Sequence, residues 1–337
     1  MTPTSTSPAD VVCLGESMVT FLPCQPGRLA DVPAFERAIG GAESNVACTL
    51  ARAGHATRWI SRVGADGFGD HLLSAISATG VDTSAVRRDP RRPTGIYFRT
   101  DGERPTSRTD TGTPRTDAPA DGSAEVPAGE VAYYRAGSAA SAMSPDTVDR
   151  SQTAAGRILH LTGITPALSA DCLALCRTLL APRPDRPLTS FDVNYRAALW
   201  SSPDEARVLL ELARGCDLVF VGEDEAAAAW GVTGGPAAIR AALPEPATLV
   251  VKQGADGATA FVRDASAARP GPNPPDAAPL HVPAPRVDVV AAVGAGDAFA
   301  AGYLSATLRG LPPHDRLRHG HLMAAAALTV PGDLAEH

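Results

Sequence analysis

The sequence predicts an α/β protein in which a doubly wound, mostly parallel sheet is flanked by helices on both faces. Short, almost wholly apolar runs recur along the chain, and helix-like segments lie between most of them. Strands that are apolar throughout are typical of parallel sheets, because helices cover both of their faces. A chain of 337 residues, of which 44% are hydrophobic and 20% charged, is long and apolar enough to bury such a core.

The expected strands are the short apolar runs rich in β-branched residues, which are 11–15, 58–64, 158–163, 188–194, 217–222 and 248–252. The expected helices lie between or after them, and they are 43–54, 66–79, 169–181, 203–214, 224–230, 296–309 and 314–330. This alternation predicts βαβ units, whose parallel strands end at one common edge of the sheet. Ligands of such folds bind at that edge, so the polar residues that follow the strands are candidate site residues.

Three segments interrupt the alternation. Residues 16–39 and 93–136 contain short strand-like runs with polar edges, which we expect to form a small sheet beside the main one. Within them, residues 101–130 contain no aromatic residue and no Leu, Ile or Met, so we interpret them as a flexible insert. Residues 264–285 hold seven prolines and are expected to be an exposed connector. We therefore expect a domain over 11–337, preceded by a disordered tail.

Composition limits the partners. The formal net charge is −7, which argues against a nucleic-acid partner. No apolar run reaches the ~18 residues that would span a bilayer, and the opening "MTPTSTSPAD" lacks the apolar core of a signal peptide. The six cysteines form no CxxC pair and no cluster with zinc spacing, so we expect buried, reduced thiols. The expected location is the cytoplasm.

A run near the C-terminus, "VGAGDAFAAGY" at 293–303, predicts a phosphate site. Gly294, Ala295 and Gly296 precede a helix, whose first N–H groups have no partner within the helix. With the helix dipole behind them, such groups bind anions. Asp297 places a carboxylate in the first turn, where it acts either as a base beside the phosphate or only as a partner of the helix dipole.

Other strand ends carry polar residues as well. The runs concerned are "GGAESN" (40–45), "FDVNYR" (191–196), "GEDEA" (222–226) and "VKQGADGA" (251–258). A Walker-A nucleotide site is excluded, because the chain holds no G-x-x-x-x-G-K-[S/T] run. A dinucleotide fingerprint is disfavoured, because Phe299 stands where the third glycine would be.

From about residue 11 to 333 the chain resembles the pfkB (ribokinase-like) carbohydrate kinases. "GAGDAFAAGY" resembles the C-terminal signature of that family, and "GGAESNVA" resembles its N-terminal di-glycine signature. Within the family, the 2-dehydro-3-deoxygluconate kinases are the most similar, through "GESMVTFLP", "YYRAGSAAS", "HLTGITPALS", "FDVNYRAALW" and "TVPGD".

The resemblance implies a role for each candidate residue. Asp297 would be the catalytic base, and the turn of Gly294, Ala295 and Gly296 would hold the transferred phosphoryl group. The residues implied to contact the sugar are Gly40, Gly41, Asn45, Tyr97, Tyr133, Arg135 and Arg196, those at 97–135 lying with Tyr134 on a small-sheet lid. Those implied to bind ATP are Asn194, Lys252, Gly254, Gly257, Glu225 and His321, with Mg²⁺ near Glu225.

Arg135 and Arg196 suit a substrate carboxylate, which a guanidinium group binds in bidentate fashion. We therefore expect transfer from ATP to 2-dehydro-3-deoxy-D-gluconate. The alternatives are a kinase for a neutral sugar such as fructose or ribose, or for a nucleoside, and a sugar-binding relative with weak activity. We also expect a homo-oligomer, a dimer or larger, formed through the lid.

Several residues have a second, structural interpretation. Arg135 would then be a solvated cation at a strand edge, and Arg196 would pair with Asp192. Tyr97 would only pack within the lid, and Gly40 and Gly41 would form a hinge. His160, in an apolar strand, is expected to be a core histidine.

The chain also departs from the family pattern at three positions. Ala291 stands where an acid helps hold a monovalent cation in relatives that potassium activates, Gly222 opens a motif that often begins with Asn, and His321 replaces an Asn that contacts the nucleotide.

Overall fold

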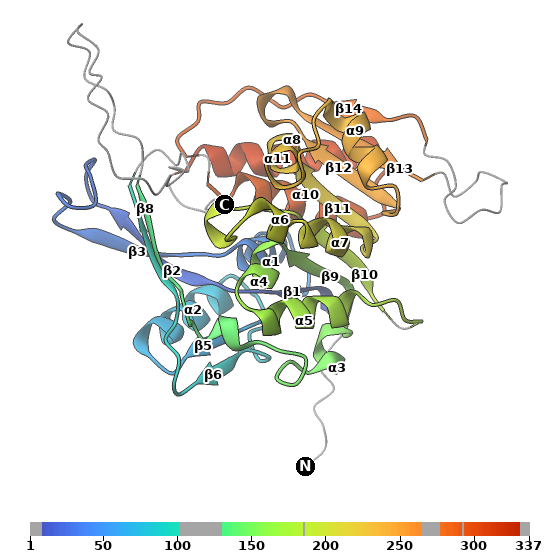
Figure 1. The fold of residues 1–337 in the computed structure, drawn as a ribbon. Helices are drawn as coiled ribbons and strands as arrows, with labels where there is room; N and C mark the ends of the chain where they lie inside the picture. Colours follow the sequence, from blue (N-terminus) through green and yellow to red (C-terminus); the bar gives the residue numbers. More distant parts are fainter. Residues whose placement is uncertain (1–8, 101–129, 185, 264–276, 292, 331–337) are drawn as a thin grey trace, which may run out of the picture.

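The computed structural model describes residues 9–100, 130–184, 186–263, 277–291 and 293–330. Most of the expected N-terminal tail and nearly all of the expected flexible insert lie outside these residues. The described chain forms a main sheet between two layers of helices, with a smaller sheet at its side (Figure 1). The predicted fold class is confirmed.

The main sheet has the strand order β14-β13-β12-β11-β10-β9-β1-β4. Six strands are parallel, and they are β1 (Ala9–Leu14), β4 (Thr57–Ile60), β9 (Gly156–Thr162), β10 (Leu188–Asp192), β11 (Leu218–Gly222) and β12 (Thr248–Lys252). Two antiparallel strands extend the edge beyond β12, and they are β13 (Ala258–Val262) and β14 (Leu280–Val282). The carboxyl ends of the parallel strands therefore meet at one edge.

Each face of the main sheet buries its own hydrophobic cluster. One cluster contains residues of α1 (Ala42–Arg52), α2 (Gly67–Ala78), α10 (Ala295–Leu308) and α11 (Pro313–Leu328). The other contains residues of α5 (Ala170–Leu180), α7 (Val208–Arg214), α8 (Glu223–Trp230) and α9 (Gly235–Ala242). In β1, Cys13 belongs to the first cluster and Val12 to the second, because successive side chains of a strand point to opposite faces.

Short helices complete the chain between these elements. They are α3 (Arg150–Thr153), α4 (Ile164–Ala167) and α6 (Pro203–Ala206), with 3₁₀ turns at Ala140–Ala142, Ala197–Leu199 and Gly254–Asp256. No described helix is both long and apolar enough to cross a membrane.

The small sheet has the order β3-β2-β7-β8 and lies on the left in Figure 1. Its strands are β2 (Met18–Pro23), β3 (Phe35–Gly40), β7 (Ile96–Arg99) and β8 (Val131–Tyr134). A separate pair, β5 (Arg62–Gly64) and β6 (Arg87–Asp89), lies below it in the same view. We call the four-stranded sheet the lid sheet.

Three sequence predictions need correction. The strand expected over 58–64 divides at Ser61, because the chain leaves the main sheet after β4 and pairs with β6 as β5. The helix expected over 203–214 is two helices, α6 and α7. The segment 264–285, expected to be only a connector, contains strand β14, which pairs with β13.

His160 lies in β9, has no exposed surface, and places Nδ1 3.0 Å from Oγ of Ser190. Burial lowers the pKa of His160 to about 4, so the ring is neutral at physiological pH. The prediction of a core histidine is confirmed.

Candidate active site

The site is built around the start of α10, at the carboxyl edge of the main sheet. Gly294 precedes the helix with φ 75°, a left-handed conformation that favours glycine. The N–H of Ala298 donates to the carbonyl oxygen of Gly294 at 2.8 Å and closes the first turn. The preceding N–H groups, from Ala295 to Asp297, have no partner within the helix. This helix end can therefore bind an anion.

The carboxylate of Asp297 lies in this first turn and is only 9% exposed. Nδ2 of Asn45, on α1, donates to its Oδ2 at 2.9 Å, and Nδ2 of Asn194, just after β10, lies 3.4 Å from its Oδ1. The two amides hold the carboxylate in one orientation. Their own Oδ1 atoms are buried and have no hydrogen-bond partner among the described residues. A ligand with hydroxyl groups beside Asp297 would satisfy both.

Asn194 has φ 39°, and it is the one described residue other than glycine with a positive φ. Asparagine tolerates this conformation better than most residues, because its side chain forms local hydrogen bonds. Here the backbone N–H of Asn194 donates to Oδ1 of Asp192 at 3.3 Å. Backbone strain of this kind concentrates at functional sites.

Four charged side chains form a network at the ends of β10, β11 and β12, which we call the rim. Nζ of Lys252 donates to both carboxylate oxygens of Asp192 at 2.9 Å and lies 4.0 Å from Oε2 of Glu225. NH1 of Arg196 lies 3.7 Å from Oε1 of Glu225. The alternative in which Arg196 pairs with Asp192 is therefore wrong.

The rim keeps Lys252 charged. Burial lowers the pKa of Lys252, but the negative charges of Asp192 and Glu225 outweigh burial and raise it. Burial raises the pKa of Glu225, Lys252 lowers it, and Asp192 raises it further. A methyl group added at Gly296 would lie 3.6 Å from Nζ of Lys252. The ammonium group therefore stands beside the open end of α10.

The three remaining residues expected near the nucleotide differ in what they touch. Gly254 has φ 58° and faces open space. Gly257 has φ 123°, and a side chain there would overlap the carbonyl oxygen of Val282. His321, buried on α11, donates from Nε2 to the same oxygen at 2.9 Å, and burial lowers its pKa. Gly257 and His321 thus both pack against Val282 of β14, whereas Gly254 is accessible to a ligand.

The lid sheet joins the site at Gly40 and Gly41. Strand β3 ends at Gly40, and α1 begins at Ala42. A side chain at Gly41 would overlap the backbone oxygen of Glu16. Glycine is therefore required here by the close approach of two backbone segments, which agrees with both the hinge and the sugar-contact interpretations.

The tyrosines lie on both faces of the lid sheet. Tyr97 and Tyr133 are paired across β7 and β8, and their ring centroids are 5.4 Å apart. Tyr97 is buried, whereas Tyr133 is 43% exposed. Tyr134 points to the opposite face, because side chains alternate along β8, and it is 64% exposed. Tyr97 and Tyr133 can therefore contact one ligand together, and Tyr134 cannot join them.

Arg135 lies at the base of the lid sheet, where its contact with a sugar stays a prediction. Its guanidinium group pairs with the carboxylate of Glu16, and Oγ of Ser138 donates to the other oxygen of Glu16 at 2.6 Å. The side chain of Arg135 is 11% exposed and that of Glu16 only 1%, so Arg135 is not a solvated cation. Nε of Arg135 is buried without a hydrogen-bond partner among the described residues. Arg135 can therefore reach a ligand only while it also holds Glu16.

Sequence reasoning missed two buried acids at this site. Glu16 directly follows β1, so the criterion of polar residues after strands would have found it. Glu43, in the first turn of α1, has no exposed surface, and its Oε1 accepts from the hydroxyls of Thr162 and Thr165 at 2.8 and 2.7 Å. Burial raises the pKa of Glu43. No sequence signal distinguishes it from an ordinary first-turn acid.

The family model that describes the pfkB family carbohydrate kinases matches residues 8–125 and 125–336. The chain belongs to this family. As a pfkB carbohydrate kinase, it is an ATP-dependent sugar kinase, and its main sheet, with a second sheet beside it, is the fold of that family.

The curated relatives agree with this assignment. The chain is 33% identical to the 2-dehydro-3-deoxygluconokinase of Bacillus subtilis (strain 168), over 96% of this chain and 91% of the relative. It is 32% identical to the 2-dehydro-3-deoxygluconokinase of Thermoproteus tenax, over 96% and 89%. The solved structure of a PfkB protein from Polaromonas sp. JS666 is 33% identical, with a TM-score of 0.77 and 95% of each chain covered.

Proposed function

We propose that this pfkB kinase transfers the γ-phosphoryl group of ATP to a hydroxyl of 2-dehydro-3-deoxy-D-gluconate. One observation carries the reaction type: the buried carboxylate of Asp297 lies at the anion-binding end of α10, held by two asparagines whose Oδ1 atoms have no partner. The names of the two curated relatives support the choice of sugar acid.

Asp297 acts as the general base. As the substrate hydroxyl attacks the γ-phosphorus, its proton passes to Asp297, and the bond to the leaving ADP oxygen breaks. Asn45 and Asn194 keep the carboxylate in place, and their free Oδ1 atoms accept hydrogen bonds from other substrate hydroxyls. These contacts hold the attacking oxygen near Asp297 and the phosphorus, which is the main contribution of positioning to catalysis.

Charge that develops on the transferred group is met by the N–H groups at the start of α10 and by Lys252. Because Lys252 stands beside Gly296 and remains protonated, it needs no proton transfer to act. When an anion enters, the ammonium group exchanges part of its contact with Asp192 for a phosphate oxygen. Open space beside Gly254 accommodates the nucleotide.

Glu225 and Asp192 fit a site for Mg²⁺. Among the described residues, no group of three His, Cys, Asp or Glu side chains could hold a metal ion by itself. Mg²⁺ commonly uses only one or two carboxylates together with substrate phosphates and water, which matches this pair. The ion would neutralise phosphate charge when bound.

The substrate carboxylate is bound by Arg196. Its side chain is 55% exposed and only 3.7 Å from Glu225, so its guanidinium can turn toward a ligand without leaving a buried acid unpaired. A planar guanidinium matches a carboxylate in bidentate fashion. Arg135 contributes mainly by fixing the base of the lid sheet through Glu16.

A panel of substrates tests this function. Purified protein is supplied with ATP and Mg²⁺, and ADP release is followed with 2-dehydro-3-deoxygluconate, its C4 epimer, fructose, ribose and a nucleoside. We expect the highest kcat/KM for one of the two sugar acids. Faster turnover of fructose, ribose or the nucleoside would refute the proposal, and no turnover of any compound would favour a binding role.

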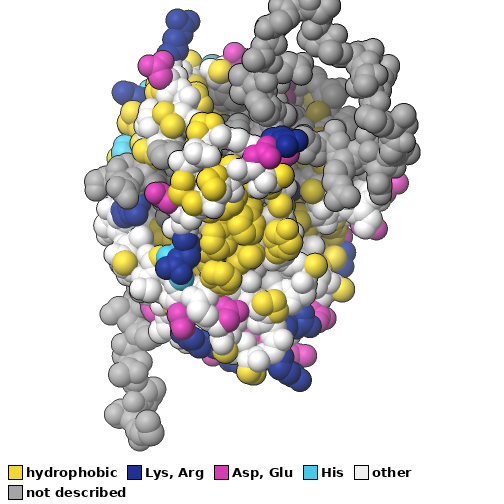
Figure 2. Space-filling view, turned by 90° about the vertical axis from the view of Figure 1, so that its left-hand side faces the viewer, with side chains coloured by type: hydrophobic (Ala, Val, Ile, Leu, Met, Phe, Trp, Pro, Cys, Tyr) yellow, Lys and Arg dark blue, Asp and Glu magenta, His cyan; other side chains and the backbone are white. Residues whose placement is uncertain are grey.

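The same proposal includes a dimer formed through the outer face of the lid sheet. Phe21 and Phe98 stack there at 4.6 Å between centroids, with Phe35 at 5.2 Å and Tyr134 at 6.0 Å from Phe98. Figure 2 views the molecule from this side and shows hydrophobic side chains gathered at the centre of the face. A contiguous apolar surface of this kind is typical of a protein interface. We expect Tyr134→Glu to convert a dimer into a monomer in sedimentation, and a wild-type monomer would refute the dimer.

A further inference from the structure

A cavity of about 260 Å³ lies between β4, the β5–β6 pair and the segment 143–152. None of the residues assigned above to the sugar or to ATP lines it. Its walls are Ile60, Ser61, Arg62, Ser84, Ala85, Val86, Arg87, Met143, Thr147, Val148, Asp149 and Gln152. The cavity is smaller than the ~300–1,000 Å³ typical of drug-sized ligands, so it suits a metabolite smaller than a nucleotide.

Two arginines face this cavity from adjacent strands. Arg62 and Arg87 are paired in register across β5 and β6, and both line the cavity. Neighbouring strands lie ~4.8 Å apart, so the two arginine side chains start from adjacent backbone positions. Arg62 donates from Nε to Asp89 at 2.9 Å, and its other guanidinium nitrogens have no partner among the described residues. An anion in the cavity could accept hydrogen bonds from both arginines.

The side chain of Arg87 makes no hydrogen bond to a described residue. Asp149 also lines the cavity, but it caps α3 by accepting from the N–H and the hydroxyl of Ser151, each at 2.8 Å. These hydrogen bonds, with Arg87 adding to them, lower the pKa of Asp149. Arg62 is already paired with Asp89, so Arg87 is the cation at the cavity wall that has no hydrogen-bonded acid among the described residues.

The rest of the lining indicates the class of anion. Oγ of Ser61 is buried without a hydrogen-bond partner among the described residues, whereas the hydroxyls of Ser84 and Thr147 already have partners. Two guanidinium groups and this one hydroxyl offer more donors than the two oxygens of a carboxylate need. Three phosphate oxygens match this donor set better. Apolar walls from Met143 and Val148 leave room for a short carbon chain.

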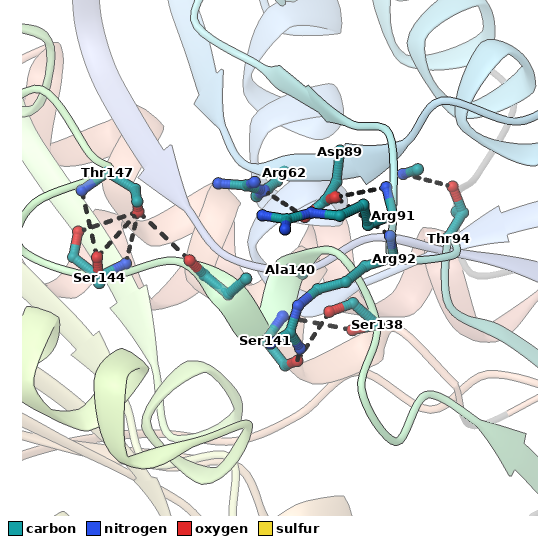
Figure 3. A network of polar contacts seen from close by, with 12 residues as sticks. Arg62, Asp89, Arg91, Arg92, Thr94, Ser138, Ala140, Ser141, Ser144 and Thr147 are labelled. Atoms are coloured by element: carbon teal, nitrogen blue, oxygen red, sulfur yellow. Dashed lines mark hydrogen bonds and ion pairs between the residues drawn. The ribbon is translucent and has the colours of Figure 1, made fainter.

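A continuous chain of polar contacts leads from this cavity to the lid sheet, and most of it is drawn in Figure 3. Asp89 accepts from Arg62 and from the backbone N–H of Arg92 at 3.1 Å, and NH1 of Arg92 donates to Oγ of Ser141 at 3.3 Å. Oγ of Ser141 donates to the carbonyl oxygen of Ser138 at 2.7 Å.

Ser138 in turn donates to Glu16, the partner of Arg135. Glu16 lies between β1 and β2, and β2 is an inner strand of the lid sheet. Hydrogen-bond networks of this kind can carry energetic coupling between sites.

We propose that this cavity is a second ligand site, which binds a small organic phosphate monoester between Arg62 and Arg87 and alters sugar binding through the contacts that end at Glu16. The phosphate draws the guanidinium group of Arg62 toward the cavity and away from Asp89. That movement shifts Asp89, Arg92 and Ser141, and so changes the position in which Glu16 holds the lid sheet.

Calorimetric titration with glycerol 3-phosphate tests the site, with Mg²⁺ and a non-hydrolysable ATP analogue saturating the phosphate subsites of the active site. We expect a Kd of about 1 mM or tighter for the wild type. Arg87→Gln should weaken binding at least about tenfold, which is the loss of one charged hydrogen bond. Arg88→Gln is the matched control, because Arg88 is the next residue of β6, pairs with Asp70 and does not line the cavity. Equal binding by Arg87→Gln and the wild type, or no binding, overturns the site.

Glycerate, which carries a carboxylate on the same carbon skeleton, separates the two anion chemistries. Glycerate binding as tight as that of glycerol 3-phosphate overturns the assignment to phosphates. These binding measurements do not depend on which sugar the enzyme phosphorylates. They therefore test the second site independently of the proposed function.

The coupling is tested by kinetics on whichever sugar the panel identifies. Saturating glycerol 3-phosphate should change the KM for that sugar by about fivefold or more, with a smaller change in kcat. Ser141→Ala removes the hydroxyl that joins Arg92 to Ser138, so it should keep the binding of glycerol 3-phosphate and lose the effect on KM. An unchanged KM in the wild type, or the same KM shift in Ser141→Ala, overturns the coupling.

Discussion

The rim and the base of the lid sheet both pair acids with cations, but they do so differently. At the rim, two acids and two cations form a chain whose contacts range from 2.9 to 4.0 Å, and Arg196 at its end is half exposed. At the lid base, one acid, Glu16, is almost completely buried, and Arg135 and Ser138 both bind it.

This comparison distinguishes ion pairs that can exchange a partner for a ligand, as at the rim, from ion pairs that hold the fold together, as at the lid base. A cation that shares several acids can leave one of them for a ligand at little cost, whereas removing the partner of a buried acid is strongly destabilising. We therefore expect changes at the rim to alter catalysis or substrate choice beyond any loss of stability, and changes at the lid base to alter stability and all substrates alike.

The largest effect is expected beside the rim, in the first turn of α10, from Asp297→Asn. Loss of the general base should lower kcat by about 10²–10⁴-fold, while asparagine keeps the size of the side chain and so the fold. Steady-state kinetics gives kcat, and calorimetry should show that sugar binding is retained. A fall in kcat of less than about tenfold would contradict the assignment of the base.

Lys252→Met removes the charge beside the start of α10 and should lower kcat by about 10²–10³-fold. It also leaves the buried Asp192 without its cation, which should cost about 3–5 kcal/mol of unfolding free energy. The double variant Asp192→Leu with Lys252→Met removes both charges, so stability should recover, whereas activity should stay low because Asp192 is also assigned to Mg²⁺. Recovery of both would mean that Lys252 acts only through stability.

Arg196→Ala and Arg135→Ala test the two regions directly. Arg196→Ala should lower kcat/KM for the sugar acid by about ten- to hundredfold, and far less for an uncharged analogue reduced at C1. Arg135→Ala should lower kcat/KM equally for both substrates and lower Tm as well, because Glu16 stays buried without a cation. If only Arg135→Ala lost the preference for the charged substrate, Arg135 would bind the substrate carboxylate and Arg196 would have the structural role.

The smallest effect is expected at Glu43, a buried acid whose Oε1 accepts from hydroxyl groups and whose Oε2 has no partner among the described residues. Burial raises the pKa of Glu43, so its contribution to stability is complete below its unfolded pKa and is lost as pH rises through the folded pKa. Glu43→Gln should therefore have a Tm at pH 8 no lower than that of the wild type. At pH 4 the two should melt alike, and a large loss of Tm at pH 8 would show that the charged form is required.

Local patterns in the sequence predicted the parts of the site that depend on neighbouring residues. Helix α10 begins within one residue of its expected start, because glycine, apolar periodicity and Asp297 all act within one turn. Asn45 was singled out beside two glycines at the start of an expected helix, and it contacts Asp297. Each of these features depends on only a few consecutive residues.

Features that depend on distant residues could not be predicted. Glu16 and Arg135 meet across 119 positions, so nothing near either residue reveals the pair. The division of 58–64 at Ser61 depends on β6, which lies more than twenty residues further along the chain. Strand β14 forms within a proline-rich segment because β13 supplies its partner. Pairing decided by tertiary contacts overrides local preference.

The short connection between β3 and α1 has a kinetic consequence. Gly40 belongs to the lid sheet, and Asn45, which holds Asp297, follows only five residues later on the same stretch of chain. A sugar that moves the lid sheet would therefore change the hydrogen bond from Asn45 to Asp297 before the nucleotide binds. We expect the two substrates to add in a fixed order, sugar first and nucleotide second, so that ADP leaves before the phosphorylated sugar can escape. Wasteful hydrolysis of ATP by water would then be slow whenever the sugar is absent.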